Sequence, residues 1–110
     1  MGAEKKLIRK NFRDACYKRD KYSCVMCGFK STPEAAEHDL DTHHINDRTI
    51  MPSGGYVAAN GISLCSPCHE KAEEFHSTGT AYPGYSIEDL YKAINSSYEL
   101  AVEASKKLKS

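Results

Sequence analysis

Hydrophobic side chains recur at helical spacing over residues 4–19, where Ile8, Phe12 and Cys16 oppose a face of lysines and arginines. This pattern predicts an amphipathic helix. Two short apolar runs, residues 40–45 and 61–65, predict strands. The segment over residues 29–38 predicts a loop with a short acidic turn. Residues 46–60 contain two adjacent glycines and predict a flexible loop.

Two more helices are predicted in the second half of the chain. Ser66 suits an N-cap and Pro67 the first helical position of a helix that ends near His76. A long last helix is predicted over about residues 86–108, because Ser86 and Asp89 match a capping box. Its apolar stripe suits core packing or a subunit contact and consists of Ile87, Leu90, Tyr91, Ile94, Tyr98, Ala101 and Leu108.

Length and composition predict one globular domain over residues 1–110. The chain is 40% hydrophobic and 27% charged, which is typical of a folded soluble protein. It contains no apolar run of the roughly 18–20 residues that a membrane span requires. The first residues lack the uninterrupted apolar stretch of a secretory signal, so a cytoplasmic, intracellular location is expected. These features exclude disordered, collagen-like, coiled-coil and membrane-spanning classes.

Charge is balanced overall but unevenly distributed. Residues 1–30 hold nine lysines and arginines against three acidic residues, whereas residues 31–50 hold five acidic residues and one arginine. A basic arm beside an acidic centre suits a protein that binds a polyanion and also holds a cation. A solvated helix face is the alternative explanation of the basic residues.

Four of the five cysteines form two pairs with the same spacing, Cys24–Cys27 and Cys65–Cys68. Two CxxC pairs predict a tetrahedral structural zinc site, in preference to two redox-active pairs. The 37 residues between the pairs exceed the usual zinc-ribbon spacing, so we expect the functional residues of the protein to lie in this insertion. Cys16 stands alone and is expected to be a buried apolar residue of the first helix.

Histidines lie within this insertion and shortly after it. His43 and His44 are adjacent on a predicted strand, so their side chains are expected on opposite faces. His69 directly follows the last cysteine of the second pair, and Asn60 precedes the second predicted strand. The pattern thus indicates a metal ligand and a separate polar group at neighbouring positions.

Over about residues 13–76 the sequence resembles the HNH endonucleases. The matching segments are Cys24–Gly28, Asp41–Ile45, Gly54–Gly55, Asn60–Cys65 and Cys68–His69. The resemblance implies an α+β fold: a small zinc-stapled treble clef with a ββα-metal motif, flanked by an N-terminal and a C-terminal helix. It also implies phosphodiester hydrolysis, with 5′-phosphate and 3′-hydroxyl ends.

The resemblance further implies a role for each polar residue. His43 and His69 look like ligands of a catalytic divalent cation, which would be Mg²⁺, Mn²⁺, Ni²⁺ or Zn²⁺. His44 looks like the general base, whose ordinary pKa suits work at neutral pH. Asn60 resembles the asparagine that orients the base. Glu73 is either a third ligand or a solvated helix residue, in which case water takes that position.

DNA is the expected partner, bound mainly through backbone phosphates. The candidate contacts are Arg13, Lys18, Arg19, Lys21 and Arg48, of which Arg13 and Arg19 rank first. The predicted function is a metal-dependent endonuclease of bacterial or phage origin, nicking DNA or cutting both strands. Two alternatives stay open: a non-catalytic zinc module that binds nucleic acid or protein, and a nuclease subunit active only in a larger phage or restriction complex. The C-terminal helix would suit docking into such a complex or homodimerisation.

Overall fold

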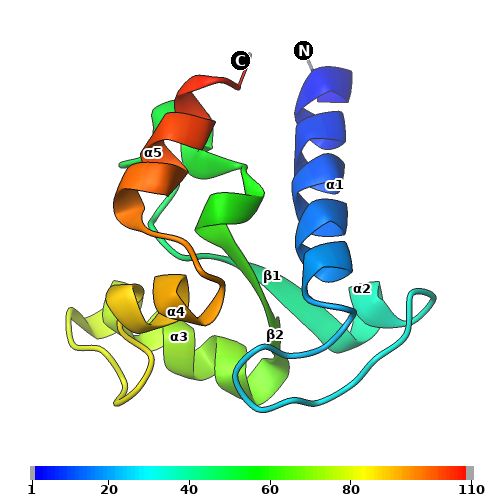
Figure 1. The fold of residues 1–110 in the computed structure, drawn as a ribbon, viewed down its shortest axis with the longest axis vertical. Coiled ribbons are helices and arrows are strands. Elements are labelled where there is room, and N and C mark those ends of the chain that lie inside the picture. Colours follow the sequence, from blue (N-terminus) through cyan, green and yellow to red (C-terminus); the bar gives the residue numbers. More distant parts are fainter. Residues whose placement is uncertain (1, 109–110) are drawn as a thin grey trace.

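A two-stranded antiparallel sheet lies at the centre of the fold, with helices around it (Figure 1). The computed structural model describes residues 2–108. Strand β1 (Leu40–His44) pairs with β2 (Gly61–Cys65), so that Leu40 lies opposite Cys65 and His44 opposite Gly61. The helices are α1 (Gly2–Arg19), α2 (Ala36–Asp39), α3 (Ser66–Thr78), α4 (Ile87–Ala93) and α5 (Tyr98–Lys106). The predicted α+β class is confirmed, and α3 and α1 each pack on both strands.

Helix α1 lies directly against β2. Phe12 and Cys16 are one helical turn apart and both are buried, as the amphipathic pattern predicts. Gly61 permits this approach, because a Cβ atom there would lie 2.6 Å from the Cys16 Sγ and 2.6 Å from the Phe12 ring. The helix ends where Lys21 and Tyr22 adopt positive φ angles of 56° and 57°.

The treble-clef order of knuckle, hairpin and helix is present. The first cysteine pair lies in a tight turn in which Gly28 has a φ of +82°, a conformation that favours glycine. One isolated antiparallel bridge, between Ser23 and Lys30, closes this turn. The second pair lies where β2 ends and α3 begins, with Cys65, one residue earlier than expected, at the N-cap position.

The single helix expected over about residues 86–108 is instead two helices, α4 and α5. The chain turns between them at Asn95, whose φ is +54°. The Ser97 side chain then caps α5 by accepting a hydrogen bond from the backbone N–H of Leu100. Helical periodicity continues across the break, which is why the apolar stripe alone did not reveal it.

The segment over residues 46–60 is more regular than the expected flexible loop. It contains two 3₁₀ turns, η1 (Pro52–Gly55) and η2 (Ala58–Asn60), and α5 packs against both. Gly55 is buried and has a φ of +68°. A Cβ atom there would lie 2.7 Å from the side-chain Nδ2 of Asn60. The paired glycines therefore serve close packing in this segment.

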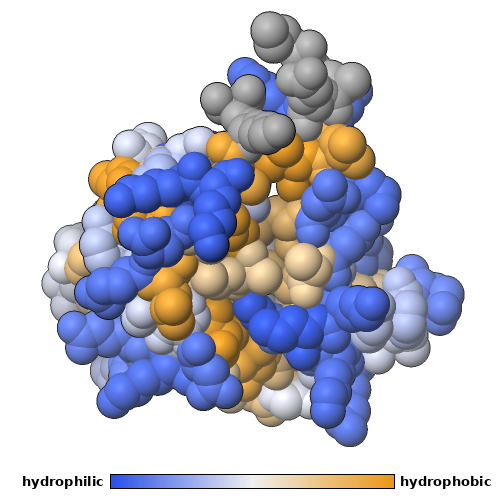
Figure 2. Space-filling view, turned by 45° about the horizontal axis from the view of Figure 1, so that its top comes forward, coloured by the Kyte–Doolittle hydropathy of each residue, from blue (hydrophilic) through white to orange (hydrophobic). Residues whose placement is uncertain are grey.

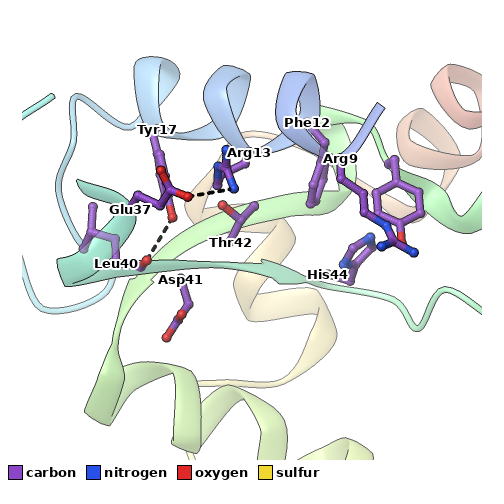
Figure 3. A pocket seen from close by; sticks show the side chains of 10 residues that line it. Arg9, Phe12, Arg13, Tyr17, Glu37, Leu40, Asp41, Thr42 and His44 are labelled. Carbon is purple, nitrogen blue, oxygen red and sulfur yellow. Dashed lines mark hydrogen bonds and ion pairs between the residues drawn. The ribbon is translucent and has the colours of Figure 1, made fainter. Parts of the chain in front are cut away.

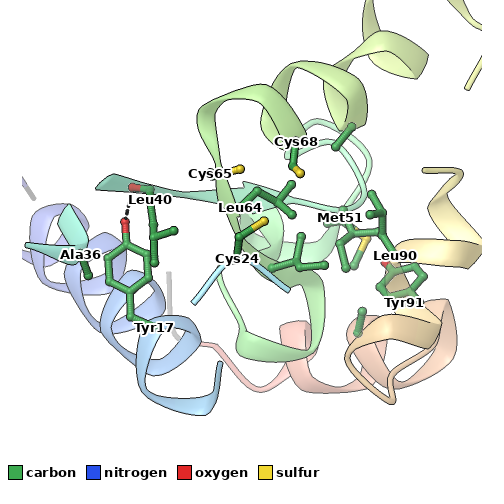
Figure 4. Packing of buried hydrophobic residues seen from close by; sticks show 14 residues of the cluster. Tyr17, Cys24, Ala36, Leu40, Met51, Leu64, Cys65, Cys68, Leu90 and Tyr91 are labelled. Carbon is green, nitrogen blue, oxygen red and sulfur yellow. Dashed lines mark hydrogen bonds between the residues drawn. The ribbon is translucent and has the colours of Figure 1, made fainter. Parts of the chain in front are cut away.

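The hydrophobic core extends from Tyr17 and Leu40, through the cysteines, to Leu90 and Tyr91 (Figure 4). Figure 2 shows one face of the molecule, where a hydrophobic band runs between two hydrophilic flanks. Among residues 2–108, no helix combines the length and the apolar character needed to cross a bilayer.

Candidate active site and metal centres

The four paired cysteines meet in one cluster. Their sulfur atoms all lie within 4.8 Å of one another, and the Cys27 and Cys65 Sγ atoms are 3.5 Å apart. Four thiolates at ordinary Zn–S distances around one ion would be about 3.8 Å apart, so this donor set fits a tetrahedral metal. The two segments that carry the pairs are joined by a hydrogen bond of 3.0 Å from the Val25 N–H to the Ser63 carbonyl.

The surroundings act differently on the cysteines of the cluster. Burial acts to raise the pKa of Cys24, but backbone N–H groups of Cys65, Cys27 and Met26 point at its sulfur and lower that pKa to about 7. Burial raises the pKa of Cys68, and it raises that of Cys65 to about 12. The Tyr85 hydroxyl donates to the Cys68 Sγ over 3.3 Å. Tyr85 thus supports a cysteine ligand from beyond the second pair.

A second candidate metal centre lies between β1 and α3. The ligand atoms of His43, His69 and Glu73 all lie within 4.8 Å of one another. The Glu73 Oε1 is 3.1 Å from the His43 Nδ1 and 3.3 Å from the His69 Nε2, so the carboxylate lies between the two rings. Two imidazoles and one carboxylate form a set that suits a first-row divalent cation.

The two histidines of this set are held in different ways. His43 is almost wholly buried, and burial lowers its pKa to about 3, which keeps the ring neutral and able to coordinate. His69 is fixed by Asp41, whose Oδ2 lies 3.2 Å from the His69 Nδ1. If the Nδ1 carries the proton, the Nε2 is left as an acceptor facing Glu73. His76 also lines this cleft of about 320 Å³.

His44 occupies a separate, aromatic environment. Its ring lies 4.6 Å from the Phe12 ring and 4.7 Å, edge to face, from the Tyr56 ring. Burial, followed by the charge of Arg48, lowers the pKa of His44 to about 4, so the imidazole is neutral at pH 7. Its Nε2 is buried without a hydrogen-bond partner. The Nδ1 is therefore the nitrogen available to a water molecule in the cleft.

Asn60 ties together the two ends of the segment that follows His44. Its Oδ1 accepts from the Asn46 N–H at 3.0 Å, and its Nδ2 donates to the carbonyls of Asn46 and Gly55, both at 3.2 Å. The Tyr91 hydroxyl donates to the same Oδ1 at 2.8 Å and accepts from the Asn46 Nδ2 at 2.9 Å. Asn60 thus holds the backbone two residues after His44, and α4 contributes to that support.

Arg19, which ranked among the first predicted DNA contacts, makes its contacts within the fold. Its guanidinium pairs with Asp20 at 2.7 Å and donates to the carbonyls of Ala58 and Gly61 at 2.6 and 2.7 Å. Asp20 in turn accepts from the Ser63 N–H at 3.0 Å. Arg19 is therefore a structural group that holds β2 against the end of α1.

The other predicted DNA contacts lie at different distances from His44. Arg13 pairs with Glu37 at 3.3 Å, in a cleft of about 410 Å³ between α1 and β1 that His44 also lines (Figure 3). Arg48 lines the metal cleft. Lys18 and Lys21 are exposed near the end of α1 where Tyr17 donates to the Leu40 carbonyl, at the opposite end of β1 from His44.

Sequence reasoning missed two residues beside His44. Arg9 lines the cleft between α1 and β1, one helical turn before Arg13, and this spacing could have signalled it. Tyr56 lies in the segment expected to be a flexible loop, and no motif marked it. Asp41 was part of the matched motif, but its contact with His69 could not be deduced from spacing.

The comparisons with known proteins agree with the motif on which the site is built. No curated protein and no solved structure matches the chain. A family model described as HNH endonuclease matches residues 24–75, which include both cysteine pairs, His43, His44 and Asn60 together with His69 and Glu73. Over residues 24–75 the chain is similar to the HNH endonucleases.

Proposed function

We propose that the protein is a metal-dependent endonuclease that hydrolyses phosphodiester bonds of DNA. The observation that carries the proposal is the arrangement of two adjacent residues of β1. His43 joins His69 and Glu73 in a set of metal-ligating atoms, while His44 is a neutral imidazole at the border of the same cleft. A binding module would need the four cysteines but neither of these features.

In this proposal each side chain has a defined task. His44 accepts a proton from the attacking water at its Nδ1, and the rings of Phe12 and Tyr56 hold the imidazole in place. Asn60 fixes the backbone that follows the base. Asp41 holds His69 in the orientation needed for coordination.

His43, His69 and Glu73 would hold the catalytic cation, which would supply Lewis-acid stabilisation of the charge that develops on the phosphate. The carboxylate of Glu73 favours Mg²⁺ or Mn²⁺ over softer ions. The four cysteines would hold a structural zinc that takes no part in the reaction.

Cleavage of supercoiled plasmid DNA tests the proposal. Wild type and His44→Ala are compared with Mg²⁺, Mn²⁺ or Ni²⁺ added, after both are shown to contain one zinc per chain. His38→Ala is the matched control, because His38 is an exposed histidine outside both clefts. We expect wild type and His38→Ala to cut, and His44→Ala to be at least about a hundredfold slower, as for loss of a general base.

Two other outcomes of this experiment would contradict the proposal. Equal cutting by all three proteins would mean that His44 is not the base or that a contaminant cuts. If none cuts although all bind DNA, the non-catalytic zinc module or the subunit of a larger complex would replace the enzyme. The docking or dimerisation role expected for the C-terminal helix stays a prediction, although Leu90, Tyr91 and Ala101 of its stripe are buried in the chain's own core.

A further inference from the structure

Two arginines from distant parts of the chain converge on one tyrosine beside His44. The Arg48 Nη1 donates to the Tyr56 hydroxyl over 3.0 Å. The Arg9 guanidinium, on α1, lies 6.0 Å from the centroid of the same ring, within reach of a cation–π contact. Partial burial acts to raise the pKa of Tyr56, but these two guanidinium groups lower it below its usual value.

Arg9 and Arg48 differ from the other arginines of α1 and its neighbourhood in their ion pairing. Arg13 and Arg19 each pair with a carboxylate, whereas Arg9 and Arg48 have no ion-pair partner among the side chains that the structure describes. Bringing two guanidinium groups to one phenol without an anion is unfavourable. The arrangement therefore suits an anion that accepts hydrogen bonds from both.

The position of this cluster suggests which anion it is. Tyr56 packs edge to face on both His44 and Phe12, at 4.7 and 5.6 Å, so its hydroxyl is held at a fixed place next to the base. His44 and Thr42 line both the metal cleft and the cleft between α1 and β1. Figure 3 shows Arg9 and Phe12 extending from α1 on the side of the second cleft where His44 lies. A chain of phosphates bound at the metal cleft would continue past His44 into this second cleft.

We propose that Arg9, Arg48 and Tyr56 form a binding site for the backbone phosphate next to the scissile one. The site rests on the proposed nuclease function and adds a substrate subsite to it. Arg9 and Arg48 donate to the non-bridging oxygens of this neighbouring phosphate, while the Tyr56 ring holds both guanidinium groups in position. The substrate class is thus a polymer with at least two consecutive phosphodiesters.

The test compares substrates with and without a neighbouring phosphate. Arg9→Ala and the double variant Arg9→Ala/Arg48→Ala are assayed on plasmid DNA and on bis(p-nitrophenyl) phosphate, which has a single phosphodiester. Lys10→Ala is the control, because Lys10 is an exposed cation of the same helix that pairs with Asp14. We expect kcat/KM on DNA to fall about tenfold for each arginine removed. Arg9→Ala should cleave the small diester as fast as wild type, because Arg9 does not line the metal cleft.

Replacing one charged phosphate of the DNA by an uncharged methylphosphonate shows which flanking phosphate the two arginines contact. Oligonucleotides carry one methylphosphonate at each position flanking the cleavage site. Wild type should lose about tenfold in cleavage rate at one flanking position, and the double variant Arg9→Ala/Arg48→Ala should lose nothing further there. Equal losses on DNA and the small diester, or a loss no larger than that of Lys10→Ala, would refute the subsite.

The subsite and the nuclease function can fail separately. If wild type cuts neither substrate with any cation, the nuclease proposal fails, and binding of labelled DNA with no added divalent cation still tests the subsite. The double variant should then reduce the dependence of log K on log salt by about 0.7–0.9, because the two arginines contact one phosphate. An unchanged slope would show that the two arginines do not contact phosphate.

Discussion

His43 and His44 are neighbours in the sequence, yet their side chains have different surroundings. Strand alternation sends His43 toward α3, where it meets His69 and Glu73, and brings His44 against Phe12 of α1. In the proposed function, the same strand thus supplies a cation ligand and a neutral imidazole that stay apart. A direct contact between the base and the cation would withdraw the electron pair that the base needs.

The residues of this site differ in how far the sequence revealed them. The histidines and cysteines could be predicted because their spacing reflects a fixed local geometry. The contacts of arginines could not, because a long side chain can reach several partners and only tertiary packing selects one. Arg13 and Arg19 ranked first on position along the chain, whereas the structure uses Arg19 inside the fold and brings Arg9 beside His44.

The burial of Cys16 predicts that the folded protein loses stability at alkaline pH. Burial raises the pKa of this thiol from 9.0 to about 12. Above pH 9 the unfolded chain therefore loses a proton that the folded chain keeps, so the free energy of unfolding falls as pH rises. The loss attributable to Cys16 should reach about 1 kcal/mol at pH 10.

Urea unfolding at pH 8 and pH 10 measures this effect in wild type and Cys16→Ala. The cavity left by the substitution lowers stability at both pH values, so only the change between them is compared. Wild type should lose more stability than the variant. Equal losses would show that the Cys16 thiol ionises as readily in the folded chain as in the unfolded one.

At the scale of elements, α4 supports the candidate active site although it lies outside the residues matched by the family model. Tyr91 bonds to both Asn60 and Asn46, which frame the segment after β1. The apolar stripe predicted a helix containing Tyr91 but gave no reason for its hydroxyl to be buried. It also missed the break at Asn95, because capping by Ser97 depends on a local turn that periodicity does not register.

Replacing Tyr91 by phenylalanine should weaken this support. The change removes two buried hydrogen bonds and leaves the Asn46 Nδ2 without its partner, at a cost of about 1–3 kcal/mol in unfolding free energy. We also expect a lower kcat, since the segment that follows His44 loses an anchor. Thermal unfolding and plasmid cleavage measure the two effects.

Tyr98→Phe is the matched control, because Tyr98 lies on α5 with about half of its surface exposed (49%). Removal of its hydroxyl should leave both stability and kcat close to those of wild type. If the two variants behave alike, the Tyr91 hydroxyl does not support the site.

At the scale of the whole molecule, the cysteine cluster joins three parts of the chain. It connects the first knuckle, the end of β2 and the start of α3. Three of its cysteines, Cys24, Cys65 and Cys68, belong to the hydrophobic core. In a chain of this size a metal contributes directly to the free energy of folding.

Purified protein should therefore contain one tightly bound zinc per chain before any catalytic cation is added. Removal of this zinc by a strong chelator should unfold the chain, with loss of the helical circular dichroism signal. Cys68→Ala should fail to retain zinc, whereas Cys16→Ala should retain it. A helical signal that survives complete removal of zinc would contradict a folding role for the metal.

The pairing of β1 with β2 links this cluster to the chemistry at the far end of the sheet. Cys65 is the last residue of β2 and lies opposite Leu40, while Ile62 and Gly61 lie opposite His43 and His44. A shift of one residue between the strands would exchange the faces of the two histidines. A metal held by the four cysteines would anchor Cys65 and fix the register of the two strands. Under the proposed function, it would thereby determine from a distance which histidine binds the cation and which receives the proton.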